Sequence, residues 1–259
     1  MRGMIIIDDK RYEHTKKFLE DKGHIFCENM PCPRNLDFAV FPFAAGIDED
    51  VYNDGFFAAI NKSAVIFSGI KNEYVAQKCA HHGLAYHIMM DDKEIAKKNA
   101  VPTSEGVIAY LVTSRQSTIA GARMLVIGYG ICGSDLAGRL KVLDAEVYTL
   151  VRNGEKEELA RKNGIIPIYL HGLFAHGFDA IINTVPSPVL TDEMIEKLGG
   201  VLLIDIASKP YGINMAAARR LNEKSTLLPA IPGKYAVKTS GEVLGQYIEN
   251  IIGGNKNDI

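Results

Sequence analysis

Short apolar runs alternate with amphipathic segments along most of the chain. In the first hundred residues, apolar residues at helical spacing predict helices at 12–22 and 72–82. Continuous apolar runs predict strands at 4–8, 24–27, 38–41, 64–67 and 85–89. Because strands that alternate with helices are the pattern of βαβ units, this region predicts an α/β domain with a largely parallel sheet.

The same alternation starts again after residue 122. An uninterrupted apolar strand at 124–127 precedes a glycine-rich turn at 128–133 and a helix with a buried stripe that includes Leu136 and Leu140. Further strands are predicted at 146–151, 165–169, 179–183, 201–206 and 226–228, with helices at 191–198 and 215–222. Near-continuous apolar strands are buried on both faces, so this region predicts a doubly wound parallel sheet.

Pro102 breaks the alternation between the two regions. It favours an extended Val101, and Thr103 or Ser104 can cap a following helix. Thr239 and Glu242 have the spacing of a capping box, so we expect the last helix to begin there. The segment 253–258 is expected to be a frayed tail. The predicted organisation is a flavodoxin-like domain over 1–102 completed by a helix at 239–253, a linker helix over 103–117, and a Rossmann domain over 118–238.

Composition excludes several classes of protein. The 259 residues carry 29 Lys and Arg against 31 Asp and Glu, so the chain lacks the basic excess of a generic nucleic-acid binder. Its apolar runs are shorter than the ~20 residues that a membrane-spanning helix needs. Asp8 and Asp9 end the N-terminal apolar run too early for a signal peptide. We therefore expect a cytoplasmic protein with no nucleic-acid or membrane partner.

The cysteines and histidines show no metal-binding pattern. Cys27, Cys32, Cys79 and Cys132 contain no C-x-x-C pair, and we expect all four to be reduced packing residues. This includes Cys132, although it lies near a helix N-terminus where a thiolate would be favoured. No two histidines have the i,i+4 spacing that places two ligands on one helix face, so no metal site is expected.

The strongest chemical signal is a glycine-rich loop between a strand and a helix. It reads Gly128-Tyr129-Gly130-Ile131-Cys132-Gly133 and fits G-x-G-x-x-G. In this motif the first glycine permits a tight turn, the second lets the backbone approach a pyrophosphate, and the third lets helix and strand pack closely. The pyrophosphate then lies at the positive end of the helix dipole. The loop predicts a dinucleotide site.

The end of the following strand bears on the type of dinucleotide. Proteins that bind NAD place an acidic residue about 20 residues beyond the motif, where it accepts from the ribose 2′-OH. Arg152, followed by Asn153, stands at that position. A guanidinium can bind a 2′-phosphate with two hydrogen bonds, so NADP is the predicted cofactor. Thr184, Pro186 and Ala207 follow two further strands and are expected to border it.

Several segments in succession resemble dipicolinate synthase A, one of the two components of the bacterial dipicolinate synthase. The resemblance runs from about Ala64 to the last helix, and the segments after the glycine loop are more specific than the loop itself. The matching residues are Phe67-Ser68-Gly69-Ile70 with Asn72 and Tyr74, Pro102-Thr103 with Glu105-Gly106, Gly128 to Gly133, Ile182 to Ser187, Asp205 to Pro210 with Gly212, Pro232-Gly233, Lys238-Thr239 and Gly241. Within the glycine loop, Ile131 departs from the polar or basic residue expected there.

The resemblance implies an NADP-dependent oxidoreductase component of that synthase. It would make dipicolinate, pyridine-2,6-dicarboxylate, from a dihydro- or hydroxytetrahydrodipicolinate precursor, in the mother cell of a sporulating bacterium. Its partner would be the flavoprotein-like dipicolinate synthase B. Glu105 and Lys238 are then the candidate bases. We expect the cyclic dicarboxylate in the cleft between the domains, near Ser68, Gly69, Thr103, Asn183, Lys209, Lys238 and Thr239.

Two other functions are compatible with the same sequence. One is an NADP reductase of the shikimate dehydrogenase type that acts on another small acid, although the N-terminal region lacks its lysine and aspartate motifs. The other is a non-catalytic NADP-binding subunit of a flavoprotein complex. The chain is also expected to form a homo-oligomer.

Overall fold

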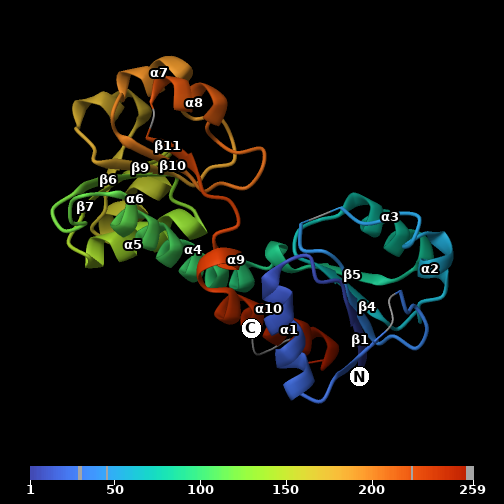
Figure 1. Cartoon of the computed structure of the whole chain (residues 1–259). Helices are drawn as coiled ribbons and strands as arrows, with labels where there is room; N and C mark the ends of the chain where they lie inside the picture. The colour runs from blue at the N-terminus through green and yellow to red at the C-terminus, as the bar shows by residue number, and fades with distance from the viewer. Residues whose placement is uncertain (29–30, 45, 223, 255–259) are drawn as a thin grey trace. The chain divides into compact units, whose positions relative to one another are not determined.

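The computed structural model describes residues 1–28, 31–44, 46–222 and 224–254 (Figure 1). The chain divides into two compact units. Unit 1 consists of Met1–Asn99 together with Ala236–Ile259, and unit 2 consists of Ala100–Tyr235. Unit 2 is therefore inserted into the sequence of unit 1.

Unit 1 is built on a five-stranded parallel sheet with the order β2-β1-β3-β4-β5. This is the strand order of flavodoxin-like folds. Its strands are β1 (Arg2–Ile5), β2 (Ile25–Phe26), β3 (Phe38–Val40), β4 (Val65–Ser68) and β5 (Ala85–Ile88). Its helices are α1 (Lys10–Asp21), α2 (Asp54–Ala58), α3 (Glu73–His82), the 3-10 helix η1 (Met89–Asp91), the first part of α4 (Lys93–Ser114), and α10 (Val237–Ile252).

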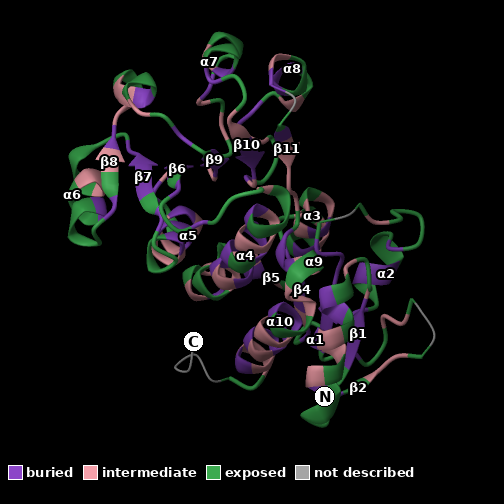
Figure 2. Ribbon diagram, turned by 60° about the vertical axis from the view of Figure 1, so that its left-hand side comes forward, coloured by how far each residue is buried: buried purple, intermediate pink, exposed green. Residues whose placement is uncertain are grey.

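Helices cover both faces of this sheet. On one face, Phe56 of α2 and Val75 of α3 pack in a cluster with Phe41. On the other face, Leu19 of α1 and Leu244 of α10 belong to a second cluster. Figure 2 shows the resulting buried strands between helices with exposed outer surfaces.

Two glycines let α10 lie directly against α1. A Cβ on Gly241 would come within 2.3 Å of the carbonyl oxygen of Arg11, and a Cβ on Gly245 within 2.7 Å of the Phe18 ring. Thr15 donates a hydrogen bond of 2.9 Å from Oγ1 to the carbonyl of Gly241. The C-terminal segment is thus part of the core of unit 1.

Unit 2 contains a six-stranded parallel sheet with the order β11-β10-β9-β6-β7-β8, the arrangement of a Rossmann fold. The strands are β6 (Arg123–Ile127), β7 (Glu146–Leu150), β8 (Ile166–Ile168), β9 (Ala180–Asn183), β10 (Leu202–Asp205) and β11 (Ser225–Leu227). Besides the rest of α4, its helices are α5 (Ile131–Val142), α6 (Gly154–Lys162), the 3-10 helix η2 (Leu170–Ala175), α7 (Asp192–Lys197), α8 (Met215–Leu221) and α9 (Pro232–Tyr235).

Alternate residues of each strand in unit 2 point to opposite faces. Val126 of β6 packs in the cluster that contains Leu136 of α5, whereas Leu125 packs in the cluster that contains Ile195 of α7. All of these side chains are buried. The predicted α/β class, with one flavodoxin-like and one doubly wound Rossmann sheet, is confirmed.

Two predicted helix starts are wrong. Helix α4 runs without interruption from Lys93 to Ser114 and contains Pro102, so Thr103 lies inside the helix and does not cap it. Burial of Thr103 and Val107 shows that packing outweighs the local preference of proline. Helix α10 begins at Val237 with Ala236 as its N-cap, so the expected capping box of Thr239 and Glu242 is wrong as well.

The expectation of four reduced cysteines is also wrong. Cys27 and Cys32 form a disulfide, with their Cα atoms 6.5 Å apart. Cys79 and Cys132 are free thiols. The short C-x₄-C spacing matches none of the metal or redox motifs that a sequence can show, so the sequence gives no signal for this pairing.

None of the helices within the described residues combines the length and hydropathy that a bilayer span requires. Of the predicted frayed tail, Gly253 caps α10, Gly254 follows it, and 255–258 lie outside the described residues.

Candidate dinucleotide site

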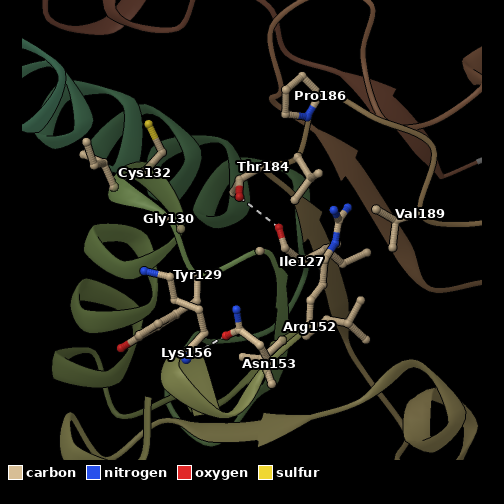
Figure 3. Close-up of a pocket in the computed structure, with 16 residues that line it drawn as sticks. Ile127, Tyr129, Gly130, Cys132, Arg152, Asn153, Lys156, Thr184, Pro186 and Val189 are labelled. Carbon is tan, nitrogen blue, oxygen red and sulfur yellow. Dashed lines mark hydrogen bonds between the residues drawn. The ribbon is translucent and has the colours of Figure 1, made fainter. Parts of the chain in front are cut away.

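A pocket of about 500 Å³ lies at the carboxyl ends of β6, β7 and β9 in unit 2 (Figure 3). Strand order reverses between β6 and β9, the place where open α/β sheets bind ligands. The lining residues are Ile127, Gly128, Tyr129, Gly130, Ile131, Cys132, Gly133, Leu150, Val151, Arg152, Asn153, Lys156, Thr184, Val185, Pro186 and Val189.

Two glycines of the loop are required by the protein itself. Gly128 has a φ of +95°, which favours glycine, and a Cβ there would come within 2.5 Å of Val185 Cγ2. A Cβ on Gly133 would lie 2.2 Å from the carbonyl oxygen of Gly128. These are the tight-turn and close-packing roles that the motif predicts.

Gly130 is different, because nothing in the described chain requires a glycine there. Its φ of −87° suits any residue, and a Cβ would meet no described heavy atom within 4 Å. Gly130 lines the pocket, so the missing side chain leaves open space beside the backbone at the start of α5. This space fits the close approach of a pyrophosphate, and the residues present therefore fit a dinucleotide.

The start of α5 provides hydrogen-bond donors. Its N-cap is Gly130, so no side chain caps the first turn. The first N–H groups of a helix have no partner inside the helix and carry its positive dipole end. The first-turn residues Ile131, Cys132 and Gly133 all line the pocket. This end of the pocket can accept an anionic group.

Two basic side chains lie at the end of β7. Arg152 points from the strand end toward the loop that carries Pro186 (Figure 3), and its Nη2 donates to Ser187 Oγ at 3.3 Å. Lys156 lines the same pocket from the first turn of α6, and its Nζ lies 3.8 Å from a carboxylate oxygen of Glu155. Asn153 caps α6 by accepting from the Lys156 N–H at 3.0 Å.

Lys156 was not expected from the sequence. The signal that could have placed Lys156 is Asn153, three residues before it. Asparagine is a preferred N-cap and accepts from the N–H of the third helical residue, which places Lys156 in the first turn beside the cap.

The β9 loop forms the opposite wall. Thr184 donates from Oγ1 to the carbonyl of Ile127 at 2.9 Å, which fixes this wall to the end of β6. Asn183 is buried, and its Nδ2 donates to the carbonyl of Val185 and to the carboxylate of Asp205. Ala207, which was also expected to border the cofactor, is buried and is not among the residues that line the pocket.

The residues predicted to bind substrate are divided between the units. Ser68, Gly69, Lys238 and Thr239 belong to unit 1, whereas Thr103, Glu105, Asn183 and Lys209 belong to unit 2. Lys238 is 75% exposed at its side chain and lies 3.9 Å from Glu242. Glu105 is half exposed, lies 3.7 Å from Nη1 of Arg139, and is not among the residues lining the dinucleotide pocket.

Tyr86 was not expected from the sequence and holds the turn after β4. Its hydroxyl accepts from the Asn72 N–H at 3.1 Å and lies 2.6 Å from Ser68 Oγ, which donates to the carbonyl of Ile70 at 2.7 Å. Because the Ser68 proton is used within the turn, the tyrosine donates to Ser68. Ser68 thus shapes the turn. Gly69 beside it is buried: its carbonyl accepts from the Met90 N–H at 3.0 Å, and the Phe43 ring leaves no room for a Cβ.

Cys132 should react slowly with iodoacetamide at neutral pH. Burial, with a smaller contribution from the negative charge of Asp135, raises the pKa of the Cys132 thiol. The thiolate is the reactive form, so a raised pKa lowers its population at neutral pH and moves labelling to more alkaline pH. Mass spectrometry of labelled peptides measures the rate, with Cys132→Ser as the background. Labelling at neutral pH as fast as that of free cysteine would contradict the assignment.

Comparison with known proteins identifies relatives of the chain. No family model matches. Dipicolinate synthase A of Bacillus subtilis (strain 168) is 30% identical over 191 residues. This chain is a relative of dipicolinate synthase A. The alignment covers 73% of the chain but 64% of the Bacillus subtilis protein, less than two thirds of that relative's length.

Solved structures agree with this relationship at the level of the fold. The crystal structure of dipicolinate synthase A from Bacillus subtilis matches with a TM-score of 0.88 at 24% identity, covering 100% of this chain and 98% of that one. The Bacillus halodurans protein of the same name gives 0.88 and 24%, covering 97% of each chain. D-Lactate dehydrogenase from Escherichia coli gives 0.64 at 13% identity, covering 100% and 99%. The chain therefore has a dehydrogenase-type fold.

Proposed function

We propose that this chain is an NADP-binding oxidoreductase subunit that forms dipicolinate from a dihydro- or hydroxytetrahydrodipicolinate precursor. The observation that carries the proposal is the open space at Gly130, which no contact within the described chain explains. The relationship to dipicolinate synthase A supports the choice of substrate.

Different residues of the pocket would bind different parts of the dinucleotide. Gly130 and the first turn of α5 would hold the pyrophosphate, while Arg152 and Lys156 would hold the 2′-phosphate of NADP. When bound, the cofactor would supply the acceptor for a hydride that leaves one ring atom, while a proton leaves a neighbouring atom. A hydroxytetrahydro precursor would first lose water to reach the dihydro level. The wall formed by Thr184 and Pro186 would exclude water from that side.

The substrate would be a partly unsaturated ring with two carboxylates. Two carboxylates need cations or N–H donors, and Lys209 and Lys238 are the cations that we assign to them. Because the product is aromatic, the oxidation is strongly favourable, and orientation with charge neutralisation would contribute more than a strong base. Glu105 and Lys238 are the candidate bases, and the Glu105 carboxylate lies 3.7 Å from Nη1 of Arg139.

A second protein is part of the proposal. The Bacillus subtilis relative is named as one subunit of a synthase, which implies a complex. We assign the flavoprotein-like dipicolinate synthase B as the partner of this chain. We further propose a homo-oligomer of this chain that works in the cytoplasm of the mother cell of a sporulating bacterium.

The test is turnover by the purified chain. The protein is mixed with NADP and the dihydro substrate, with and without dipicolinate synthase B, and formation of reduced nicotinamide is followed by absorbance. Turnover without the partner supports the proposal. Binding of NADP without turnover in either mixture would favour a non-catalytic NADP-binding subunit. In a parallel assay shikimate replaces the ring dicarboxylate, and turnover with shikimate alone would favour a reductase of another small acid.

Removal of either assigned lysine should weaken substrate binding. Lys209→Ala and Lys238→Ala are each expected to raise the KM for the dicarboxylate about 10-fold, because each removes a charge-assisted hydrogen bond worth roughly 1.5 kcal/mol. Lys197→Ala, which removes an exposed lysine of α7, is the control. Unchanged kinetics in both variants would show that the lysines are wrongly assigned.

A further inference from the structure

Asp205 is a fully buried carboxylate at the end of β10. Oδ1 accepts from the N–H of Ala207 and from Nδ2 of Asn183, both at 2.9 Å. Oδ2 accepts from the N–H of Gly212 at 2.9 Å and from the N–H of Ile213 at 2.8 Å. Both oxygens are therefore used within the protein.

These hydrogen bonds hold the loop at 206–213. Moving a carboxylate out of water is costly unless donors replace its hydration, and here three of the four donors are backbone N–H groups of this loop. The donors come from both ends of the loop, at Ala207 and at Gly212 and Ile213. Lys209 lies between them. One side chain thus fixes both ends of the segment that carries Lys209.

The fourth donor joins this loop to the dinucleotide pocket. Asn183 Nδ2, which contacts Asp205, also donates to the carbonyl of Val185 at 3.0 Å. Asn183 Oδ1 accepts from the Val185 N–H at 3.2 Å. Val185 and its neighbours Thr184 and Pro186 line the dinucleotide pocket. The amide of Asn183 therefore links the carboxylate to the wall of that pocket.

Direct packing of the two loops supports the same link. A Cβ on Gly212 would lie 2.2 Å from the carbonyl oxygen of Val185 and 2.3 Å from Nδ2 of Asn183. It would also lie 3.0 Å from the carbonyl oxygen of Ser187. The loop at 206–213 is thus in backbone contact with the loop at 183–187, and a methyl group would force them apart.

We propose that Asp205 is a positioning residue that locks the loop carrying Lys209 to the loop forming one wall of the dinucleotide pocket, so that both are held in one arrangement. The proposal rests on the proposed function, because it assigns the first loop to the substrate and the second to the cofactor. Asp205 touches neither ligand; it acts through the two loops.

Asp205→Asn is the main test variant. It keeps the shape of the side chain but places an amide NH₂ where either Gly212 and Ile213 or Ala207 and Asn183 now donate. Gly212→Ala is an independent variant that leaves Asp205 intact, and its added methyl group would push the two loops apart. Thr149→Val is the matched control, because it removes a buried hydrogen bond of 3.1 Å to the Val126 carbonyl in the same sheet, a bond in which neither loop takes part.

Hydrogen exchange of the protein without added cofactor tests the lock independently of the proposed function. In Asp205→Asn, amide exchange should accelerate at least about 10-fold both at 206–213 and at 184–187, and Thr149→Val should change neither. In Gly212→Ala, amide exchange should accelerate in the same two segments. Acceleration confined to 206–213, or spread evenly over unit 2, would overturn the lock.

Ligand constants test the positioning role. Asp205→Asn should raise both the NADP Kd and the substrate KM about 10-fold, whereas Lys209→Ala should raise the substrate KM alone. A lower melting temperature with both constants within 2-fold of wild type would overturn the role and leave Asp205 purely structural. If the wild-type chain neither binds NADP nor turns over, the proposed function fails, and the positioning role fails with it even where hydrogen exchange supports the lock.

Discussion

Gly130→Ala should weaken dinucleotide binding about 10- to 100-fold without harming the fold. The backbone at Gly130 suits alanine, and the new methyl group would meet no described atom within 4 Å. It would instead occupy the space that a pyrophosphate needs. An overlap of this kind costs roughly 1–3 kcal/mol, which corresponds to the expected loss of affinity. Calorimetric titration with NADP measures the Kd, and thermal unfolding measures the stability.

Gly138→Ala is the matched control for this variant. Gly138 lies further along α5, and a Cβ there also meets no described atom within 4 Å. The alanine should stabilise the helix by up to about 1 kcal/mol and leave the Kd unchanged. If Gly130→Ala binds NADP as tightly as Gly138→Ala does, the glycine loop does not hold a pyrophosphate.

Arg152→Asp should reverse the preference between NADP and NAD. The variant removes a cation from the end of β7 and introduces a carboxylate that repels a 2′-phosphate. Loss of a charge-assisted hydrogen bond costs about 1.5–3 kcal/mol, so the NADP Kd should rise about 10- to 100-fold. The new carboxylate can accept from a ribose 2′-OH, so NAD binding should improve. The ratio of the two Kd values is the measurement.

Arg34→Asp, the same change at an exposed arginine of unit 1, controls for the change in net charge. Lys156→Ala should weaken NADP binding less than Arg152→Asp, because a lysine makes single rather than paired contacts. A ratio that stays at its wild-type value in Arg152→Asp would show that this residue does not contact the 2′-phosphate.

Strands were predictable from the sequence because buried parallel strands are continuous apolar runs. The run at 124–127 differs from β6 by one residue, and that at 85–89 differs from β5 by one residue. Helix α6 was missed, because its sequence is almost entirely polar and Ala160 is its one buried residue. A helix without an apolar stripe gives no periodic signal, and here the Asn153 cap is the better evidence.

The dinucleotide pocket was more predictable than the substrate side. Its glycines follow the end of β6 and Arg152 follows the end of β7, so their spacing in the sequence predicts that they lie at the same edge of the sheet. Spacing does not locate Glu105 in this way. Its position depends on whether Pro102 interrupts helix α4, and the sequence alone does not decide that. The hydrogen bond between Tyr86 and Ser68 joins two strands, and no spacing rule predicts it.

The interrupted sequence of unit 1 determines how the protein can be dissected. Residues 100–235 form a continuous stretch, but the boundary between Asn99 and Ala100 lies inside helix α4, so a fragment of unit 2 that keeps this helix whole must begin at Lys93. A fragment that stops at residue 99 would lack α10 and expose the face of α1 against which Gly241 and Gly245 pack. An isolated version of that half therefore requires a designed splice that connects Asn99 to Ala236.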